Sequence, residues 1–487
     1  MNLHTLLAAL SLPTEGYPAV DLQGIALNHQ NIQPGFLFVA VKGEKHDARD
    51  YIPEAIRSGA AAVFYEPYSE TRHRGEADRV PCIPILNLKA KISQLAGIFY
   101  QNPSRDLKVI GITGTNGKTS ISHFLAQAFL EFQLPCGVLG TIGNGLWPDI
   151  QEASRTTGDP IEIQRMLRAL KNQGARTIAM EVSSHGLTQH RVEAIAFDSA
   201  IFTNLTRDHL DYHPTMENYY QAKKKLFDRP ELQYAVIPIE DPYGLRLSQE
   251  MTSKARKILI GQCPHTQGDF VLEYCRPHLA GTEVSIKTPL GKIETLIPLI
   301  GDFQIKNLLS VIAILWKEGV CLEAMTHWLS RVQSVRGRME VISRQPWVLI
   351  DYAHTPEGLA SALRAIRPYV RGKLWVVFGC GGDRDRGKRS LMAQIAEREA
   401  DHVIVSSDNP RSESLEHIFE DIRTGFYHPE NIGFMASREE AVKAACSQLG
   451  PDDGLLLAGK GHERWEQRGA ELLPVDEAGW AKAILAR

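Results

Sequence analysis

The chain alternates between short apolar runs and longer segments in which apolar residues recur every three or four positions. Short apolar runs between polar or glycine-rich turns predict buried strands, and the longer period predicts amphipathic helices. In the central part of the chain the predicted strands are 107–110, 177–182 and 200–203, and the predicted helices are 120–132 and 161–172. Alternation of strands with helices indicates βαβ units and a mostly parallel sheet.

A second alternation of the same kind follows residue 338. Apolar runs predict strands at 348–350, 374–378, 403–405, 432–435 and 455–457. Helical patterns lie between them, at 357–367, 388–399, 414–425 and 439–449. This order predicts a doubly wound α/β domain, which binds ligands at the carboxyl ends of its strands. Polar residues follow these strands, namely Asp351 with His354, 381–384, 408–411 and 460–463.

The remaining segments set the domain boundaries. The first hundred residues mix shorter elements, with predicted strands at 36–41 and 61–65 and a predicted helix at 52–59. Residues 101–106 contain Asn-Pro-Ser and predict a linker, while 231–298 is rich in strand patterns. A length of 487 residues predicts three domains. We place them at 1–104, 105–335 and 336–487, with the second boundary near 334–338.

Composition excludes several classes of protein. The net charge of −3 gives no electrostatic reason to expect binding to nucleic acid or to an anionic membrane. The seven cysteines are scattered without a C-x-x-C pair, which fits a reducing cytoplasm better than a disulfide framework. The apolar patch 6–12 has no basic flank and no cleavage site, and no apolar run is long enough to span a membrane. We therefore expect a cytoplasmic protein that is not embedded in a membrane.

The most informative motif is Gly111-Ile-Thr-Gly-Thr-Asn-Gly-Lys-Thr-Ser120, which joins a predicted strand to a predicted helix. Backbone N–H groups of such a loop and a helix N-terminus bind phosphate. Lys118 can reach the β- and γ-phosphates of a nucleotide, and the Thr119 hydroxyl can ligate Mg²⁺. Position 112 is Ile, so the strict G-x-x-x-x-G-K-[ST] spacing fails and the loop is a variant form. The predicted fold class is α/β, with three domains, a central P-loop-type ATPase domain and a C-terminal Rossmann-like domain.

Polar residues also follow the two later strands of the central part. Glu181 ends one strand, and a carboxylate beside a phosphate-binding loop is the expected Mg²⁺ ligand of an ATP enzyme; a buried structural ion pair is the alternative. The other strand runs into the polar segment 203–213, in which His209 is a candidate metal ligand. Three consecutive lysines, 223–225, lie on a helix predicted to begin near Met216. Their pattern alone indicates a solvated basic face and singles out none of them.

Short motifs along nearly the whole chain carry a family resemblance. They are 113–119, 156–158, 181–187 with 189–191, 203–205 with 207–213, 337–340, 351–354, 379–384, 408–411 and 459–463. Together they resemble the motifs of the Mur ligases of bacterial cell-wall synthesis. The resemblance is greatest to the branch that adds meso-diaminopimelate to UDP-N-acetylmuramoyl-L-alanyl-D-glutamate. It implies an ATP-dependent ligase that forms ADP and phosphate and acts as a monomer in peptidoglycan synthesis, cell shape and division.

The resemblance implies roles on the nucleotide side of the reaction. ATP would be bound by the phosphate loop and by three later residues, in full Gly114, Thr115, Asn116, Gly117, Lys118, Thr119, Ser120, Asn307, Arg338 and Asp351. Catalysis would involve Lys118, Glu181, His209 and Lys223. Mg²⁺ would be held by Thr119, Glu181, His209 and Lys223, with Lys223 carbamylated to N6-carboxylysine. Carbamylation turns a cation into an anion with two oxygens, which suits a hard metal.

The resemblance also implies two further binding regions. The UDP-substrate would contact Leu27, His29, Thr156, Thr157, Ser183, Gln189 and Arg191. Residues 28–30 are Asn-His-Gln, where the family usually has Asp-Ser-Arg. Diaminopimelate would contact Arg384, Asp408, Asn409, Pro410, Arg411, Gly459 and Glu463. A guanidinium at Arg411 can bind a carboxylate through two hydrogen bonds, and Glu463 would face an ammonium.

Three other functions are weighed against this one. A lysine-adding Mur ligase disagrees with the motif 408–411, and a folylpolyglutamate synthetase-like ligase disagrees with the N-terminal domain. A nucleotide-binding regulator without ligase chemistry has no need of the metal-binding and substrate-binding residues in one chain. ATP would convert the D-glutamate carboxylate to an acyl phosphate, which the amine of the added amino acid then attacks. Lys118 and Mg²⁺ would stabilise charge on the transferred phosphoryl group.

Overall fold

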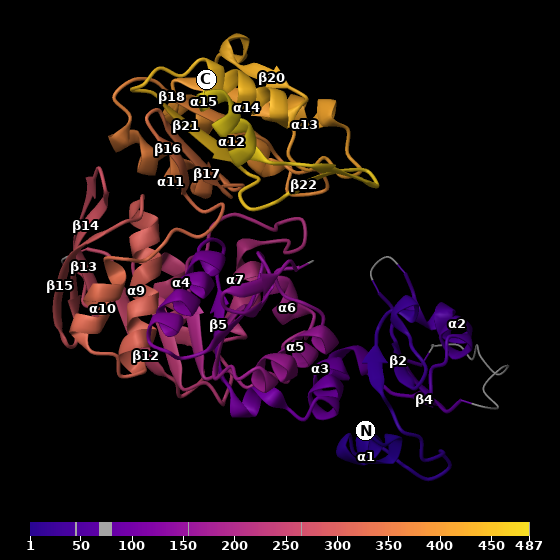
Figure 1. The fold of residues 1–487 in the computed structure, drawn as a ribbon. Coiled ribbons are helices and arrows are strands. Elements are labelled where there is room, and N and C mark those ends of the chain that lie inside the picture. Colours follow the sequence, from indigo (N-terminus) through magenta and orange to yellow (C-terminus); the bar gives the residue numbers. More distant parts are fainter. Residues whose placement is uncertain (44–45, 68–79, 154, 264, 487) are drawn as a thin grey trace. The chain divides into compact units, whose positions relative to one another are not determined.

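The chain forms two compact units in the computed structural model (Figure 1), which describes residues 1–43, 46–67, 80–153, 155–263 and 265–486. The first unit comprises 1–111, 133–199 and 229–233. The second unit comprises 112–132, 200–228 and 234–487. Each unit is described by itself.

The first unit begins with a small parallel sheet in the order β1-β2-β3-β4. Side chains of its strands alternate between two faces, because Leu37 and Val39 pack with α1 and α3 whereas Phe38 and Ala40 pack near α2. The elements are α1 (Leu3–Ala9), β1 (Gly24–Ala26), η1 (His29–Asn31), β2 (Phe36–Ala40), η2 (Ala48–Tyr51), α2 (Ile52–Arg57), β3 (Ala62–Tyr65), β4 (Cys82–Pro84) and α3 (Leu88–Phe99). The three elements predicted here are confirmed within two residues.

The segment predicted as a linker is ordered, so that prediction was wrong. Residues Pro103–Asp106 form the 3₁₀ helix η3, and Asn102 before it has φ +44°. Ser104 is buried, and its hydroxyl accepts a hydrogen bond from the backbone N–H of Ala196 at 3.1 Å. Proline is tolerated in the first turn of a helix, where its missing N–H has no partner to lose. The Asn-Pro-Ser sequence therefore begins a short helix that packs on the unit.

The rest of the first unit follows the order β5-β9-β6-β7-β8. Strands β6 and β9 pair in parallel, whereas β7 and β8 are added as an antiparallel hairpin. The helix α5 begins where the Asp159 carboxylate accepts hydrogen bonds from two backbone N–H groups of its first turn at 2.9 Å. The elements are β5 (Lys108–Thr113, whose last two residues belong to the second unit), β6 (Cys136–Leu139), β7 (Asn144–Leu146), β8 (Asp149–Gln151), α5 (Pro160–Asn172), β9 (Thr177–Glu181) and α6 (Ser184–Thr188).

The second unit contains strands in the order β15-β14-β13-β12-β11-β10. Strands β11 to β13 pair in parallel, as the prediction of a mostly parallel sheet requires, and β13 to β15 pair antiparallel at the edge. The reason is that tight turns join β13 to β14 and β14 to β15, and a tight turn can only connect antiparallel strands. The elements are α4 (Lys118–Glu131), β10 (Ser199–Phe202), α7 (Met216–Lys224), β11 (Tyr234–Pro238), α8 (Pro242–Glu250), β12 (Arg256–Gly261), β13 (Phe270–His278), β14 (Gly281–Thr288), β15 (Gly291–Ile297), α9 (Asp302–Lys317) and α10 (Leu322–Leu329).

The C-terminal part of the second unit is a six-stranded sheet in the order β16-β17-β21-β18-β19-β20. All its pairs are parallel except β16 with β17. The strands are β16 (Glu340–Arg344), β17 (Trp347–Asp351), β18 (Leu374–Phe378), β19 (His402–Ser406), β20 (Gly433–Met435) and β21 (Gly454–Ala458). The helices are α11 (Pro356–Ile366), η4 (Arg367–Tyr369), α12 (Gly387–Glu399), α13 (Leu415–Arg423), η5 (Pro429–Asn431), α14 (Arg438–Ser447) and α15 (Glu477–Leu485).

Helices cover both faces of this sheet, which confirms the doubly wound prediction. Leu349 and Val376 pack in one apolar cluster with α11, α12 and α13. Their neighbours Ile350 and Val377 pack in the opposite cluster with α14 and α15. Strand β21 lies between β17 and β18, so the strand order changes direction there. The loops after β17, β18, β19 and β21 consequently meet at one edge, where a doubly wound sheet binds its ligand.

Two features near the C-terminus were not predicted. The hairpin β22 (Trp465–Arg468) with β23 (Glu471–Pro474) is short and mostly exposed, so it lacks the apolar alternation that signals a strand. Helix α15 is likewise short. Across the part of the chain that the structure describes, no helix combines the length and apolar character needed to cross a membrane.

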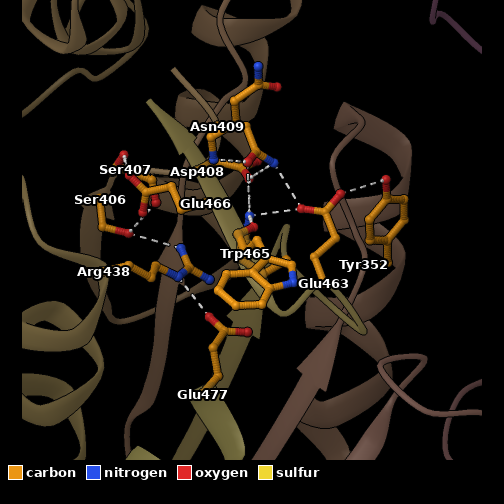
Figure 2. Close-up of polar contacts among 12 residues, drawn as sticks. Tyr352, Ser406, Ser407, Asp408, Asn409, Arg438, Glu463, Trp465, Glu466 and Glu477 are labelled. Atoms are coloured by element: carbon orange, nitrogen blue, oxygen red, sulfur yellow. Dashed lines mark hydrogen bonds and ion pairs between the residues drawn. The ribbon is translucent and has the colours of Figure 1, made fainter. Parts of the chain in front are cut away.

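A buried ion pair holds α15 to the edge of the sheet (Figure 2). The Nε of Arg438 donates to Glu477 at 2.7 Å, and its other nitrogens donate to Ser406 Oγ at 2.9 Å and to the carbonyl of Ala458 at 2.8 Å. The Arg438 and Glu477 side chains are 1% and 3% exposed. The pair thus connects the ends of β19 and β21 to both helices of one face.

Replacement of Arg438 tests this connection. Arg438→Leu leaves a buried carboxylate without its cation, so we expect the free energy of unfolding to fall by about 3 to 5 kcal/mol. Urea unfolding measures the change, and Arg364→Leu, which removes an exposed pair with Glu399, should cost less than about 1 kcal/mol. A double variant R438L/E477L that recovers no stability would contradict this account.

Candidate active site

The glycine-rich loop between β5 and α4 is held tightly by its neighbours in the second unit. Gly114 has φ +148°, and a Cβ there would lie 1.8 Å from Thr203 Oγ1. Gly117 has φ +90°, and a Cβ there would lie 2.5 Å from Asn307 Oδ1. The Thr203 hydroxyl donates to the carbonyl of Asn116 at 2.5 Å. Both glycines are therefore required for the close packing of this loop, which leads into the N-terminus of α4 and suits a phosphate group.

Two lysine amines converge on the same backbone carbonyl. Lys118 Nζ donates to the carbonyls of Gly114 and Thr115, each at 2.9 Å, and Lys223 Nζ donates to the carbonyl of Gly114 at 2.8 Å. Lys223 is 1% exposed and lies 4.5 Å from the centroid of the Tyr219 ring. Burial, together with the charge of Lys118, holds the pKa of Lys223 well below its ordinary value. The pair of amines forms a strongly anion-binding position.

The structure distinguishes the three consecutive lysines 223–225 at the end of α7. Only Lys223 is buried, whereas Lys225 is exposed just beyond the helix. Lys224 makes an ion pair with Asp228 at 2.7 Å. The general expectation of a solvated basic face therefore fails for Lys223 alone, because the helix turns this one residue towards the glycine-rich loop.

A buried carboxylate near this loop gathers three basic side chains. Asp208 lies 3.4 Å from His209 Nε2, 3.7 Å from His354 Nε2 and 3.7 Å from Lys388 Nζ. Although burial acts to raise it, the nearby His354, His209 and Lys388 side chains hold the pKa of Asp208 well below its ordinary value. His209 has φ +54°, a strained conformation for a residue other than glycine. The candidate metal ligand is thus positioned by a carboxylate next to it.

Arg338 connects the start of α4 to the end of β17. Its Nη2 donates to the Thr119 hydroxyl at 3.1 Å, and its guanidinium lies 4.2 Å from the centroid of the Tyr352 ring. Its Nε is buried without a hydrogen-bond partner among the described residues.

Burial raises the pKa of Asp351 to about 6, and its carboxylate accepts from the backbone N–H of Met339 at 2.8 Å. The loop residues Thr115 and Ser120 are also buried. These groups suit a polar ligand with phosphate oxygens.

Glu181 is fully buried in the first unit and is held by one threonine. Its two oxygens accept from the backbone N–H and the hydroxyl of Thr141, each at 2.9 Å. The same hydroxyl lies 3.0 Å from Thr156 Oγ1. Thr157 Oγ1 donates to the carbonyl of Glu181 at 3.0 Å and accepts from the N–H of Ser183 at 2.9 Å. The end of β9 is therefore fixed to the segment around residue 157.

The predicted UDP-substrate residues of this region lie together. Arg191 Nη1 donates to the carbonyl of Thr157 at 2.7 Å, and its Nε donates to Gln189 Oε1 at 2.9 Å. The Ser183 hydroxyl caps α6 by accepting from the N–H of Gly186 at 3.1 Å. A small cavity opens beside them, lined by Leu139, Asn144, Thr156, Thr157, Gly158, Glu162, Ile163, Met166 and Met180.

The other two predicted contacts to the UDP-substrate lie in the N-terminal sheet. Leu27 is half-buried against the core of that sheet. His29 stacks on Tyr51 with 4.3 Å between ring centroids and an angle of 5°, and its Nε2 lies 3.7 Å from a Glu54 oxygen. His29 therefore presents an aromatic face where the family usually has a serine.

The predicted diaminopimelate residues converge at the carboxyl edge of the C-terminal sheet. Arg411 Nη1 donates to the carbonyl of Gly382 at 2.8 Å, and a Cβ placed on Gly381 would lie 2.8 Å from Arg411 Nη1 and 3.8 Å from the side chain of Arg384. Burial, with the nearby charge of Arg384, lowers the pKa of Arg411. Arg411 and Asp383 have φ values of +55° and +54°. Two arginines at the loop 381–384 favour the binding of an anion here.

An acidic group lies in the neighbouring loops. Asn409 Nδ2 donates to Glu463 Oε2 at 2.8 Å and to Asp408 Oδ1 at 3.2 Å. Gly459 has φ +112°, and a Cβ there would lie 3.4 Å from an Asp408 oxygen. Pro410 is buried. Positive and negative side chains therefore lie within one set of connected loops, as an amino acid ligand requires.

The sequence assigned no role to several residues near the proposed site. Thr141 holds Glu181, and Lys388 and His354 contact Asp208. His354 was noted only as a polar residue after a predicted strand, and nothing in the sequence relates position 388 to position 208. Lys460, noted in the same way, is discussed below. Within the described ranges, no three His, Cys, Asp or Glu side chains gather in an arrangement that could hold a metal ion.

Three family models match successive parts of the chain. The Mur ligase family, catalytic domain, matches residues 21–100; the Mur ligase middle domain matches 112–315; and the Mur ligase, glutamate ligase domain, matches 337–461. The order agrees with a three-domain organisation. The boundaries expected at 104 and 335 stay predictions.

Relatives and solved structures resemble the whole chain. A UDP-N-acetylmuramoyl-L-alanyl-D-glutamate--2,6-diaminopimelate ligase from Coxiella burnetii is 41% identical over 96% of both chains, and one from Pseudomonas aeruginosa is 43% identical over 96% of this chain and 95% of its own. A solved ligase of that name has a TM-score of 0.69 at 30% identity and covers 100% of this chain and 99% of its own. A folylpolyglutamate synthase from Mycobacterium tuberculosis shares only the fold, with a TM-score of 0.65 at 17% identity over 82% of this chain and 96% of its own. The chain belongs to the Mur ligase family.

Proposed function

We propose that this ATP-dependent ligase adds meso-diaminopimelate to UDP-N-acetylmuramoyl-L-alanyl-D-glutamate during peptidoglycan precursor synthesis. The observation that carries the proposal lies at the carboxyl edge of the C-terminal sheet, where Arg411 donates to the carbonyl of Gly382 and Asn409, two residues before Arg411, holds the carboxylate of Glu463. Diaminopimelate has a carboxylate and an ammonium at its far end, whereas lysine has only the ammonium. The names of the relatives with 41% and 43% identity agree with this substrate.

The reaction requires activation of a carboxylate, which is a poor electrophile at neutral pH. A D-glutamate oxygen attacks the γ-phosphorus of ATP, and the bond to the β-phosphate oxygen breaks, which gives an acyl phosphate and ADP. The amine of diaminopimelate then attacks the acyl carbon, loses a proton and expels phosphate. The amine of Lys118 and the guanidinium of Arg338 lie at the glycine-rich loop and would stabilise the transferred charge.

Mg²⁺ would be held by donors whose chemistry suits it. In the second unit, the Thr119 hydroxyl and a carbamate on Lys223 are hard oxygen ligands of the kind Mg²⁺ prefers, and His209 would be a further ligand. The Glu181 carboxylate of the first unit is the remaining ligand that we propose. When bound, Mg²⁺ neutralises charge on the phosphate oxygens. Hydrogen bonds from Thr141 orient both oxygens of Glu181.

The environment of Lys223 suits carbamylation. Its amine is buried, and burial together with the charge of Lys118 holds the pKa of Lys223 well below the ordinary value, which favours the neutral amine. A neutral amine attacks carbon dioxide, an N–C bond forms and a proton is released. The resulting anion would remove the repulsion between Lys223 and Lys118.

The UDP-substrate would be bound by the first unit. We assign to it the connected residues Thr156, Thr157, Ser183, Gln189 and Arg191, together with Leu27 and His29 of the N-terminal sheet. We further propose that the enzyme acts as a cytoplasmic monomer with domains at 1–104, 105–335 and 336–487. A lysine-adding ligase is the second candidate, which Arg411 disfavours because lysine offers it no second carboxylate.

The substrate assignment is tested by ATP-dependent phosphate release. With UDP-N-acetylmuramoyl-L-alanyl-D-glutamate present, we expect turnover with meso-diaminopimelate and little with L-lysine at equal concentration. Omission of the UDP-substrate is the control for uncoupled ATP hydrolysis. Turnover with lysine alone would overturn the assignment.

Arg411 is expected to set the preference for diaminopimelate. Arg411→Met removes a charge-assisted contact worth about 1.5 to 3 kcal/mol, so kcat/KM for diaminopimelate should fall roughly 10- to 100-fold. The KM values for ATP and for the UDP-substrate should stay within about twofold. Arg423→Met, which changes an arginine on α13 of the same domain, is the matched control. Equal losses for both variants would count against a substrate contact.

Carbamylation of Lys223 is testable by ¹³C NMR. Protein equilibrated with ¹³C-bicarbonate should show a carbamate signal that Lys223→Arg lacks and that Lys224→Arg keeps. Removal of carbon dioxide should lower kcat, and added bicarbonate should restore it. A signal that survives in K223R would place the carbamate elsewhere.

A further inference from the structure

A buried lysine lies behind the two loops that carry the proposed diaminopimelate contacts. The Lys460 side chain is 0% exposed, directly after β21. Its Nζ donates to Glu463 Oε2 at 2.8 Å, to the carbonyl of Trp465 at 2.7 Å and to Asn409 Oδ1 at 3.2 Å. All three hydrogens of the ammonium therefore have acceptors. The Nζ atom of Lys460 also lies 3.7 Å from Asp408 Oδ1.

The side chain of Asn409 is fully occupied by the protein. Its Oδ1 accepts from Lys460 and, at 2.8 Å, from the backbone N–H of Gln467, and its two Nδ2 hydrogens go to Asp408 and Glu463. An amide offers two donors and two acceptor positions, so no capacity is left for a ligand. The side chain of Asn409 thus connects loops, and only its backbone can contact the amino acid.

Glu463 is held from one side. Its Oε2 accepts from both Lys460 and Asn409, whereas its Oε1 lies 3.4 Å from the Tyr352 hydroxyl, a long contact (Figure 2). A carboxylate fixed through one oxygen keeps the other available for an ammonium ligand. Without Lys460, Asn409 would be the only one of these two donors left to hold Glu463 Oε2.

The same residues connect Glu463 to Arg411. The N–H of Arg411 donates to the carbonyl of Gln467 at 3.0 Å, and the carbonyl of Arg411 accepts from Gly469 at 2.6 Å. Gln467 in turn donates to Asn409, which Lys460 contacts. The acidic and the basic sides of the pocket are therefore joined through one connected set of hydrogen bonds.

We propose that Lys460 is a positioning residue for amino acid selection: it sets the distance between the ammonium-binding oxygen of Glu463 and the guanidinium of Arg411. The proposal rests on the proposed function, because it assumes that this pocket binds the added amino acid. An apolar residue of similar length would fill the same space, and buried cations are seldom the most stable choice for a core. The three hydrogen bonds that the Lys460 ammonium donates, to Glu463, Asn409 and the carbonyl of Trp465, explain why a lysine is buried here.

The test compares Lys460→Met with wild type in full steady-state kinetics. Loss of the cation frees Glu463, so the KM for diaminopimelate should rise at least about tenfold, a loss of about 1.4 kcal/mol. The KM values for ATP and for the UDP-substrate should stay within about twofold. The double variant K460M/E463Q should be no worse than E463Q alone, because Lys460 acts through Glu463.

Asp453→Ala is the matched control for lost stability. Asp453 accepts from the N–H groups of Lys373 and Gly450 at 2.6 and 2.8 Å, at the opposite edge of the same sheet, so its loss should lower the melting temperature without changing the KM for diaminopimelate. A K460M enzyme that resembles D453A in KM would overturn the proposal, as would multiplicative effects of K460M and E463Q.

Failure of the proposed function would look different. If the wild-type enzyme used lysine instead, K460M should raise the KM for lysine. The role of Lys460 as a positioning residue would then be supported, whereas the assignment of diaminopimelate as the substrate would be contradicted. A crystal structure of K460M without substrate gives a readout that needs no turnover. It should show the Glu463 carboxylate shifted from its wild-type position, because only one of the two donors to Oε2 is left, and an unchanged Glu463 would overturn the proposal.

Discussion

The proposed active site depends on one topological constraint, the insertion of β21 between β17 and β18. Parallel strands that are neighbours in a sheet must end at the same edge. Because β21 lies in the middle, the segment after it reaches both the loop after β17 and the loop after β19. The backbone N–H of Gly459 donates to the carbonyl of Asp351 at 3.0 Å, and Asp408 lies close to Gly459 on the other side. Residues a hundred positions apart are thus brought into one site by strand order.

The glycine-rich loop 111–120, by contrast, depends on close packing of its backbone against neighbouring side chains. At Gly114 and Gly117 the backbone approaches Thr203 and Asn307 more closely than any side chain would allow. The variant spacing of the motif is compatible with this, because the first close approach occurs at residue 114, whereas position 112 is buried inside β5. The loop is defined by which neighbours it touches, and the strict pattern is only one way to meet that requirement.

Much of the fold could be predicted from the sequence, and the reasons are local. Five strands of the C-terminal domain are apolar and are separated by amphipathic helices, so their limits were found within two residues, whereas β16, none of whose residues is buried, was not predicted. The antiparallel strands β13 to β15 and the hairpin β22–β23 were harder, because their exposed faces are polar. Individual site residues followed from motifs, but the choice among lysines 223–225 needed the family resemblance and was then explained by the burial of Lys223 alone. The partners of Asp208 and Asn409 could not be found, because they depend on contacts between distant loops.

The saturated side chain of Asn409 has a consequence for how this enzyme can change. Each of its four hydrogen-bonding positions is matched to a group of opposite polarity, so an aspartate there would place an acceptor against the acceptors of Asp408 and Glu463. A replacement of Asn409 would therefore need compensating replacements among the side chains that it contacts, Asp408, Lys460 and Glu463.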